Sequence, residues 1–186
     1  MNSSSLLRDL RYACRTFRKK PGFALAVILP LLSASAQQLA ELQKADIVED
    51  AIALDYWNKT LSGEDLPESV QASYYSANAL TFLGIPPLLG RVFTASDGPP
   101  GKESGGVVVL THRFWQSRYG SQPNVVGKTI DLNREPYTVI GVVPPRFDNY
   151  LGDVIVPIHL KFDPGFAWGV QARLKPGVSR STAELS

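Results

Sequence analysis

Cysteine and histidine are nearly missing from this chain. Among 186 residues there are one cysteine, Cys14, and two histidines, His112 and His159. A single cysteine excludes an intrachain disulfide and a cysteine-ligated metal site. The histidines stand in no H-x-x-x-H or H-x-E pattern, so no zinc or other metal site is expected. The cysteine-free body of the chain is compatible with an oxidising compartment.

The motifs that carry catalysis or nucleotide binding are also missing. There is no G-x-x-x-x-G-K-[ST], so ATP binding is not expected, and no G-x-S-x-G elbow for a nucleophilic serine. Gly105-Gly106 precedes a strand pattern and does not open a helix, which excludes a phosphate-binding loop. Asp148, Asp153 and Asp163 are loop carboxylates without a cleft that would pair them. We therefore expect no catalytic residue, no cofactor and no enzymatic activity.

Acidic charge is scarce at the start of the chain. Residues 1–20 contain one acidic residue, Asp9, whereas the rest of the chain has 13 basic and 16 acidic residues, a net charge of −3. The basic residues of this head are Arg8, Arg11, Arg15, Arg18, Lys19 and Lys20. A basic head on a mildly acidic body indicates a membrane surface, and not a nucleic acid, as partner.

Residues 1–20 are predicted to form a basic amphipathic juxtamembrane helix. Apolar residues recur there at spacings of three and four, so they share one face. The residues expected to face the membrane are Leu6, Leu7, Leu10 and Phe17. On an anionic bilayer, each basic side chain near the surface contributes about 1 kcal/mol. The alternative is a solvated helix packed on the body of the protein.

Residues 21–40 are predicted to be a hydrophobic anchor or signal segment, because no charge occurs between Lys20 and Glu41. The expected membrane-facing residues are Phe23, Leu25, Val27, Ile28 and Leu29. The apolar part is short and contains Pro30, so as a transmembrane helix it is marginal. A signal peptide cleaved after Ala36 and a buried helix of a cytosolic protein remain open. The membrane anchor and the signal peptide both place everything after about residue 40 outside the cytoplasm.

Residues 41–186 are predicted to form an α+β domain with a mixed sheet and few helices. Helix is favoured over residues 37–50 by propensity and over 78–82 as a single turn. Strands are expected at 51–57, 70–76, 107–110, 125–132, 136–143, 154–158 and 166–174. The continuous apolar run 107–110 predicts a central strand. Pro157 favours an edge position for 154–158.

The stretch 105–145 has the clearest pattern. Thr111 is a plausible N-cap of a helix that ends at Gly120, and Asn133-Arg134-Glu135 is predicted to turn a hairpin. Core packing is expected for the aromatic residues Trp57, Tyr74, Tyr75, Phe114, Trp115 and Tyr119. Near the end, Ser181-x-x-Glu184 resembles a capping box at the start of a helix. Because the sequence stops there, the domain is expected to be incomplete at its C-terminus.

Several segments, taken together, resemble a known family. They are LLRDLRYACRTFRKKPGFALAVIL, YSANALTFLGIPPLLGRVFTASD, VVVLTHRFWQSRYG, VVGKTIDLNREPYTVIGVVPPRF and VQARLKPGVSRSTAEL. They are similar to the extracytoplasmic core domain of MacB-like, FtsX-like ABC transporter permeases, and they occur in that family's order. The residues that carry the likeness, expected to be structural, are Gly90, Arg91, Phe93, Trp115, Gly120, Gly127, Asn133, Gly141 and Pro144.

The resemblance implies a non-enzymatic transport component in the bacterial inner membrane, with its domain on the periplasmic side. It implies a separate ATP-binding subunit, the remaining permease helices and a membrane as partners. The family's second half is absent from this sequence, so the chain resembles a truncated relative, for which a homodimer is possible. The alternative is a free periplasmic binding or adaptor domain released by cleavage after Ala36. The substrate is not implied.

Overall fold

The computed structural model describes residues 33–34, 36–62, 66–98, 106–148, 151–158 and 168–176. Three predicted features lie outside these residues: the juxtamembrane helix, most of the hydrophobic segment with all of its expected membrane-facing residues, and the Ser181–Glu184 capping box. Within the described ranges, no helix is long and apolar enough to cross a membrane.

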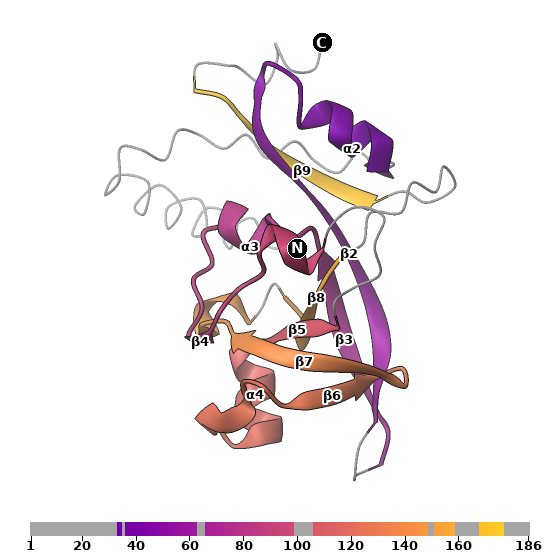
Figure 1. Cartoon of the computed structure of the whole chain (residues 1–186), viewed down its shortest axis with the longest axis vertical. Helices are drawn as coiled ribbons and strands as arrows, with labels where there is room; N and C mark the ends of the chain where they lie inside the picture. The colour runs from indigo at the N-terminus through magenta and orange to yellow at the C-terminus, as the bar shows by residue number, and fades with distance from the viewer. Residues whose placement is uncertain are drawn as a thin grey trace, which may run out of the picture.

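The longest element is strand β2 (Val48–Ser62), which runs through most of the molecule in Figure 1. Its first half pairs antiparallel with β9 (Trp168–Leu174), and its second half pairs antiparallel with β3 (Glu68–Tyr75). Helix α2 (Ala36–Leu42) precedes it. The helix predicted over 37–50 is too long: α2 ends at Leu42, and from Val48 onward the chain is a strand of the sheet.

Six of the described strands close into a ring. Beside β2 and β3 these are β8 (Val154–Pro157), β5 (Val107–Leu110), β7 (Glu135–Val142) and β6 (Thr129–Leu132). The ring closes because β6 pairs with β7 on one side and with the end of β2 on the other. Two short strands, β1 (Ser33–Ala34) on β9 and β4 (Leu89–Gly90) on β7, extend the sheet outside the ring. The predicted mixed sheet with few helices is confirmed.

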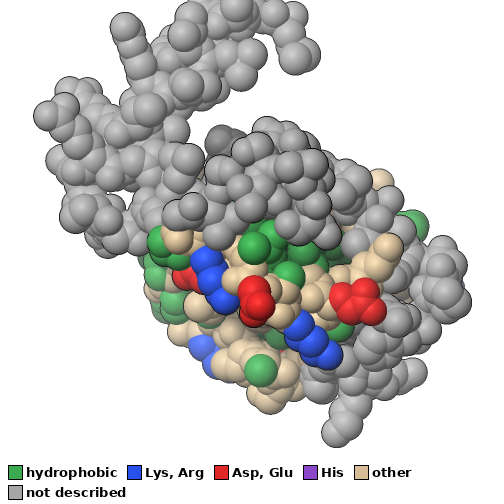
Figure 2. Space-filling view, turned by 90° about the horizontal axis from the view of Figure 1, so that it is seen from above, with side chains coloured by type: hydrophobic (Ala, Val, Ile, Leu, Met, Phe, Trp, Pro, Cys, Tyr) green, Lys and Arg blue, Asp and Glu red, His purple; other side chains and the backbone are tan. Residues whose placement is uncertain are grey.

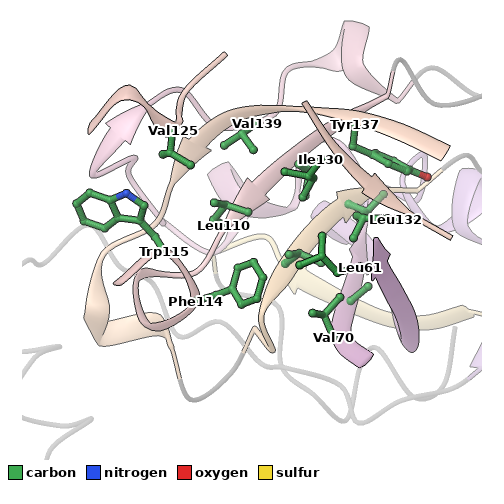
Figure 3. Packing of buried hydrophobic residues seen from close by; sticks show 14 of the residues in the cluster. Leu61, Val70, Leu110, Phe114, Trp115, Val125, Ile130, Leu132, Tyr137 and Val139 are labelled. Atoms are coloured by element: carbon green, nitrogen blue, oxygen red, sulfur yellow. The ribbon is translucent and has the colours of Figure 1, made fainter. Parts of the chain in front are cut away.

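The interior of the ring is the main apolar core, shown in Figure 3. Alternate residues of each strand point inward, as the period of two in a strand requires. The inward residues include Leu61, Val70, Ala72, Val108, Leu110, Ile130, Leu132, Tyr137, Val139, Val154 and Val156. The strand at 107–110 is central, as predicted. Val108 and Leu110 face the interior of the ring, whereas Val109 faces outward and is buried in a second apolar cluster.

Strand β8 corrects one prediction. Pro157 suggested an edge strand, but β8 lies between β3, with which it is parallel, and β5, with which it is antiparallel. The pairing with β5 covers only Val154 and Ile155, so Pro157 lies beyond the end of that ladder. On the β3 side the hydrogen bonding continues, because the amide of Ile158 donates to the Tyr75 carbonyl at 2.8 Å. The missing N–H of proline therefore costs no sheet hydrogen bond here.

Helix α4 (His112–Tyr119) covers one part of this core with Phe114 and Trp115, both of which are buried. Gly120 ends the helix with φ of +57°, as its predicted C-cap role requires. Thr111 stands at the N-cap, but its hydroxyl donates to the Asp153 carbonyl and caps nothing in the helix. The strand predicted from residue 125 is also too long, since Pro123–Val125 forms a 3-10 turn, η2, and β6 begins at Thr129.

Two further apolar clusters lie outside the ring. Helix α3 (Ala79–Phe82) packs on the face of β2 that carries Ile52 and Leu54. Helix α2 packs through Leu39 on the opposite face, with Ala51 and Ala53. The first half of β2 is thus covered on both faces, which explains its continuous buried run.

Candidate functional site

The crossing of β4 and β7 brings together several residues of the predicted signature. Gly90 and Gly141 are paired across the two strands. A Cβ on Gly141 would lie 2.2 Å from the carbonyl oxygen of Arg91, and a Cβ on Gly90 would lie 2.2 Å from that of Ile140. Only glycine lets the two backbones approach this closely. The same corner buries Phe93.

Arg91 holds the loop that follows this crossing. Its guanidinium donates to both carboxylate oxygens of Asp97, at 2.6 and 2.9 Å, and to the Val92 carbonyl at 3.2 Å. Asp97 also accepts hydrogen bonds from the amide and the hydroxyl of Thr94, at 2.7 and 2.8 Å. These donors lower the pKa of Asp97 to about 2, with the Arg91 hydrogen bond as the largest cause. The hydrogen bonds of Asp97 therefore hold the backbone of this corner in place. Because its oxygens are occupied by Arg91 and Thr94, Asp97 is not an available catalytic carboxylate.

The other signature residues lie around the β6–β7 hairpin and α4. Asn133, with φ of +56°, begins the hairpin turn, and its side chain accepts the amide of Thr60 in β2 at 2.7 Å. Gly127 has φ of +90° and donates its amide to Val139. The Trp115 indole donates to the Gln122 carbonyl at 2.9 Å. Pro144 precedes the 3-10 turn η3 (Pro145–Phe147).

A lysine lies where the ring closes. The side chain of Lys59 is 11 % exposed, donates to the Tyr137 hydroxyl at 3.3 Å and approaches Glu135 at 3.7 Å. Its ammonium also lies over the rings of Tyr137 and Tyr74, 5.2 and 5.8 Å from their centroids. Burial favours a lower pKa for Lys59, but Tyr74 and Tyr137 offset it and raise the pKa above 10.5. Lys59 is therefore a cation at neutral pH that ties β2 to the hairpin.

An open pocket of about 360 Å³ lies on the outer face of the sheet. Its apolar lining comes from Leu83, Ile85, Phe147 and Leu151, and its polar lining from Tyr56, Tyr75, Arg146 and Gln171. The two tyrosine hydroxyls are 3.0 Å apart and hydrogen bonded to each other. Tyr75 is 4 % exposed, and burial raises its pKa far above the usual range, so it stays protonated. The lining of this pocket holds no nucleophile paired with a base.

Two further ion pairs of the described residues lie on and beside helix α4. His112 approaches Asp148 at 3.8 Å, and Arg113 approaches Asp153 at 3.3 Å. Within the described ranges, no group of three or more His, Cys, Asp or Glu side chains could hold a metal ion. In the part of the surface that is described in Figure 2, basic and acidic side chains are interspersed with hydrophobic ones.

Sequence reasoning missed the pocket and the lysine. Tyr56, Arg146 and Gln171 come from segments far apart in the chain, and no local spacing links them. The alternation of Lys59 with Leu61 in β2 was the only signal that the lysine points into the ring. The predicted core position is confirmed for Tyr75, Phe114 and Trp115 but is wrong for Trp57, which is 51 % exposed. Trp57 is paired with Ala72 of β3, which belongs to the interior cluster, but Trp57 itself is not part of that cluster.

Comparison with solved structures places this architecture among the extracytoplasmic domains of transporter permeases. The periplasmic region of MacB from Actinobacillus actinomycetemcomitans superposes with a TM-score of 0.68 at 20 % identity, covering 83 % of this chain and 71 % of that one. The extracellular domain of the noncanonic ABC-type transporter YknZ from Gram-positive bacteria gives a TM-score of 0.64 at 16 % identity, covering 85 % and 87 %. At these identities the likeness concerns the fold.

The family itself is shown by a family model, that of the MacB-like periplasmic core domain, which matches residues 15–185. The chain belongs to this family, as the resemblance of its motifs indicated. The comparison with curated proteins gives no significant match. The chain is thus a domain of the MacB-like ABC transporter permease family, with a place outside the cytoplasm.

Proposed function

We propose that this chain is a non-enzymatic component of an ABC-type transporter, in which a rigid extracytoplasmic domain passes ATP-driven motion to an exported substrate or a partner. The ATP-binding subunit is a separate protein, and further permease helices complete the path through the inner membrane. The family match over most of the chain supports this proposal.

The observation that carries the proposal is the position of β1. Residues Ser33 and Ala34 pair with Gly169 and Trp168 of β9, and β9 pairs in turn with β2. The sheet therefore begins inside the predicted hydrophobic segment 21–40, directly after its most apolar part, which ends at Leu32. A displacement of that apolar part would reach the sheet through β1, which follows it in the chain and is hydrogen bonded to β9.

Passing on motion also requires a stiff domain, and the closed ring of strands supports this. In the described residues, each of its six strands is hydrogen bonded on both sides, and its interior is filled by apolar side chains. A packed and closed sheet deforms little, so it moves as one body. Two different arrangements of this body relative to the membrane would then form the transport cycle.

The alternative is a free periplasmic binding or adaptor domain, released by cleavage after Ala36. Such a cut would remove β1 and the first residue of α2. The released chain would lose the β1–β9 pairing, so the structure supports the anchored form over this one. The expected homodimer stays a proposal. Among the described strands, β1 covers only Trp168 and Gly169 of the outer edge of β9, which leaves an edge for pairing.

The experiment is to express the full chain in a bacterial host and to determine its mature N-terminus by mass spectrometry after membrane fractionation. The anchored form predicts an intact basic head in the membrane fraction. A mature chain that begins at Gln37 in the soluble periplasmic fraction contradicts the proposal. Size analysis of the same sample tests the homodimer, which a monodisperse monomer excludes.

A further inference from the structure

We propose that the pocket between η3, β2 and β9 is a binding site for a small amphipathic anion. Its ligand has a flat aromatic or short aliphatic body and one carboxylate, sulfonate or phosphate group. This function is separate from the mechanical role above, and neither depends on the other.

The floor of the pocket accounts for the apolar body. Leu151, Ile85 and Tyr75 are buried to 4 % exposure or less, so they hold their positions without a ligand. Leu83 and Phe147 line the same space and are only partly buried. The volume of about 360 Å³ lies in the range of ligand pockets. A cavity of about 150 Å³ already admits benzene, so two fused rings fit here.

Arg146 accounts for the negative charge. It is the one charged residue in the lining, and no carboxylate of the described residues forms an ion pair with it. Its guanidinium lies over the Phe147 ring, 4.8 Å from the centroid, and this ring is part of the apolar lining. The nearby Asp148 is directed elsewhere, since it accepts the Arg113 amide and faces His112.

Two neutral groups add directed hydrogen bonding. The side-chain amide of Gln171 makes no hydrogen bond to another described residue, although it lines the pocket. The two tyrosine hydroxyls share one hydrogen between them at 3.0 Å, which leaves the second hydrogen for a ligand or water. Because Tyr75 stays protonated, this donor persists at any physiological pH. A cation, an amide and a hydroxyl pair thus belong to the lining of an otherwise apolar space, which is the composition of a ligand site.

The test uses two probes that differ only in charge, naphthoate and naphthamide. Each is titrated calorimetrically into the full chain in a non-ionic detergent, with detergent alone as blank. We expect saturable binding with naphthoate favoured about fivefold, the upper range for a solvent-exposed ion pair. In Arg146→Gln the preference disappears and the affinity for naphthamide stays the same.

Two further variants control for charge and for the site. Arg134→Gln removes the same charge at the β6–β7 turn and is expected to keep the fivefold preference. Leu83→Trp fills the pocket and is expected to abolish binding of both probes. If thermal unfolding shows that this variant does not fold, Gln171→Trp replaces it, since tryptophan is accepted in strands. Equal affinity for the two probes, a preference that survives in Arg146→Gln, or no saturable binding to the unmodified chain overturns the proposal.

Discussion

Replacing Arg91 by alanine tests whether the corner after β4 stabilises the domain. Asp97 is 7 % exposed and accepts four hydrogen bonds, two of them from Arg91. Without the guanidinium, a buried carboxylate keeps only the two bonds from Thr94. A buried charge that loses partners is costly, so Arg91→Ala is expected to lower the free energy of unfolding.

The size of the effect follows from the pKa of Asp97. Lowering it from 3.8 to about 2 corresponds to about 2.4 kcal/mol. Part of this comes from Thr94, and the Arg91 side chain is 49 % exposed, so solvent screens the pair. We therefore expect a loss of about 1.5 kcal/mol. For a domain of this size that lowers the melting temperature by about 3–6 °C.

The pH dependence gives a second measure of the same interaction. The pKa of Asp97 is lower in the folded protein than in the unfolded chain, so the stabilisation is present above about pH 4 and is lost as pH falls towards 2. Asp97→Asn lacks this contribution at every pH. The difference in free energy of unfolding between the unmodified chain and Asp97→Asn should therefore be largest near neutrality. It should shrink as the pH falls from about 4 to about 2.

Thermal unfolding followed by circular dichroism measures both effects on the full chain in detergent. Arg113→Ala is the matched control, because its ion pair with Asp153 is longer, at 3.3 Å, and its side chain is 58 % exposed. That change should cost no more than about 0.5 kcal/mol. If Arg91→Ala melts within 1 °C of the unmodified chain, or if the gap for Asp97→Asn does not vary with pH, the reasoning is refuted.

Three further changes address other parts of the fold. Gly141→Ala should cost about 3 kcal/mol or more in thermal unfolding, because the new Cβ would lie 2.2 Å from a backbone oxygen. The control Gly84→Ala should cost about 1 kcal/mol, since Gly84 has φ of +65° but no neighbour within 4 Å. Equal costs contradict the close approach of β4 and β7. Asn133→Ala should speed hydrogen exchange of the Thr60 amide and cost about 2 kcal/mol of stability, because it removes the acceptor of that amide. Asn133→Asp is the control, since it keeps a side-chain acceptor. Unchanged exchange in the alanine variant argues against the β2–β6 closure. Trp115→Phe should cost about 2 kcal/mol in urea unfolding, since it removes both buried volume and the indole hydrogen bond, and a neutral result rules out its packing role.

Local features were predictable from the sequence because their causes are local. The hairpin turn at Asn133 and Arg134 has positive φ at both residues, which is the condition that this kind of turn imposes on the sequence. The left-handed Gly120 at the end of α4 follows from the same steric rule. The family likeness also depended on such short motifs, and the family match agrees with it.

Features that depend on distant pairing were not predictable. Whether Pro157 harms a strand depends on how far the neighbouring strand extends, and that is set by topology and not by the proline. The closure of the ring depends on two residue pairs between β2 and β6, including Leu61 with Leu132, which lie far apart in the chain. The pocket combines residues of five segments for the same reason, so its site residues carried no recognisable spacing.

The pairing of β2 also sets the order in which this chain can fold. Val48 pairs with Leu174, 126 residues later (174 − 48). At synthesis rates of about 5–20 residues per second, the first half of β2 waits about 6–25 s for its partner strand. During that time its hydrogen-bonding edge and the apolar residues that β9 will cover remain open to other chains. Contacts this distant in sequence also slow the folding step itself. The chain therefore depends, between synthesis and completion of β9, on whatever protects an unfinished sheet in its compartment.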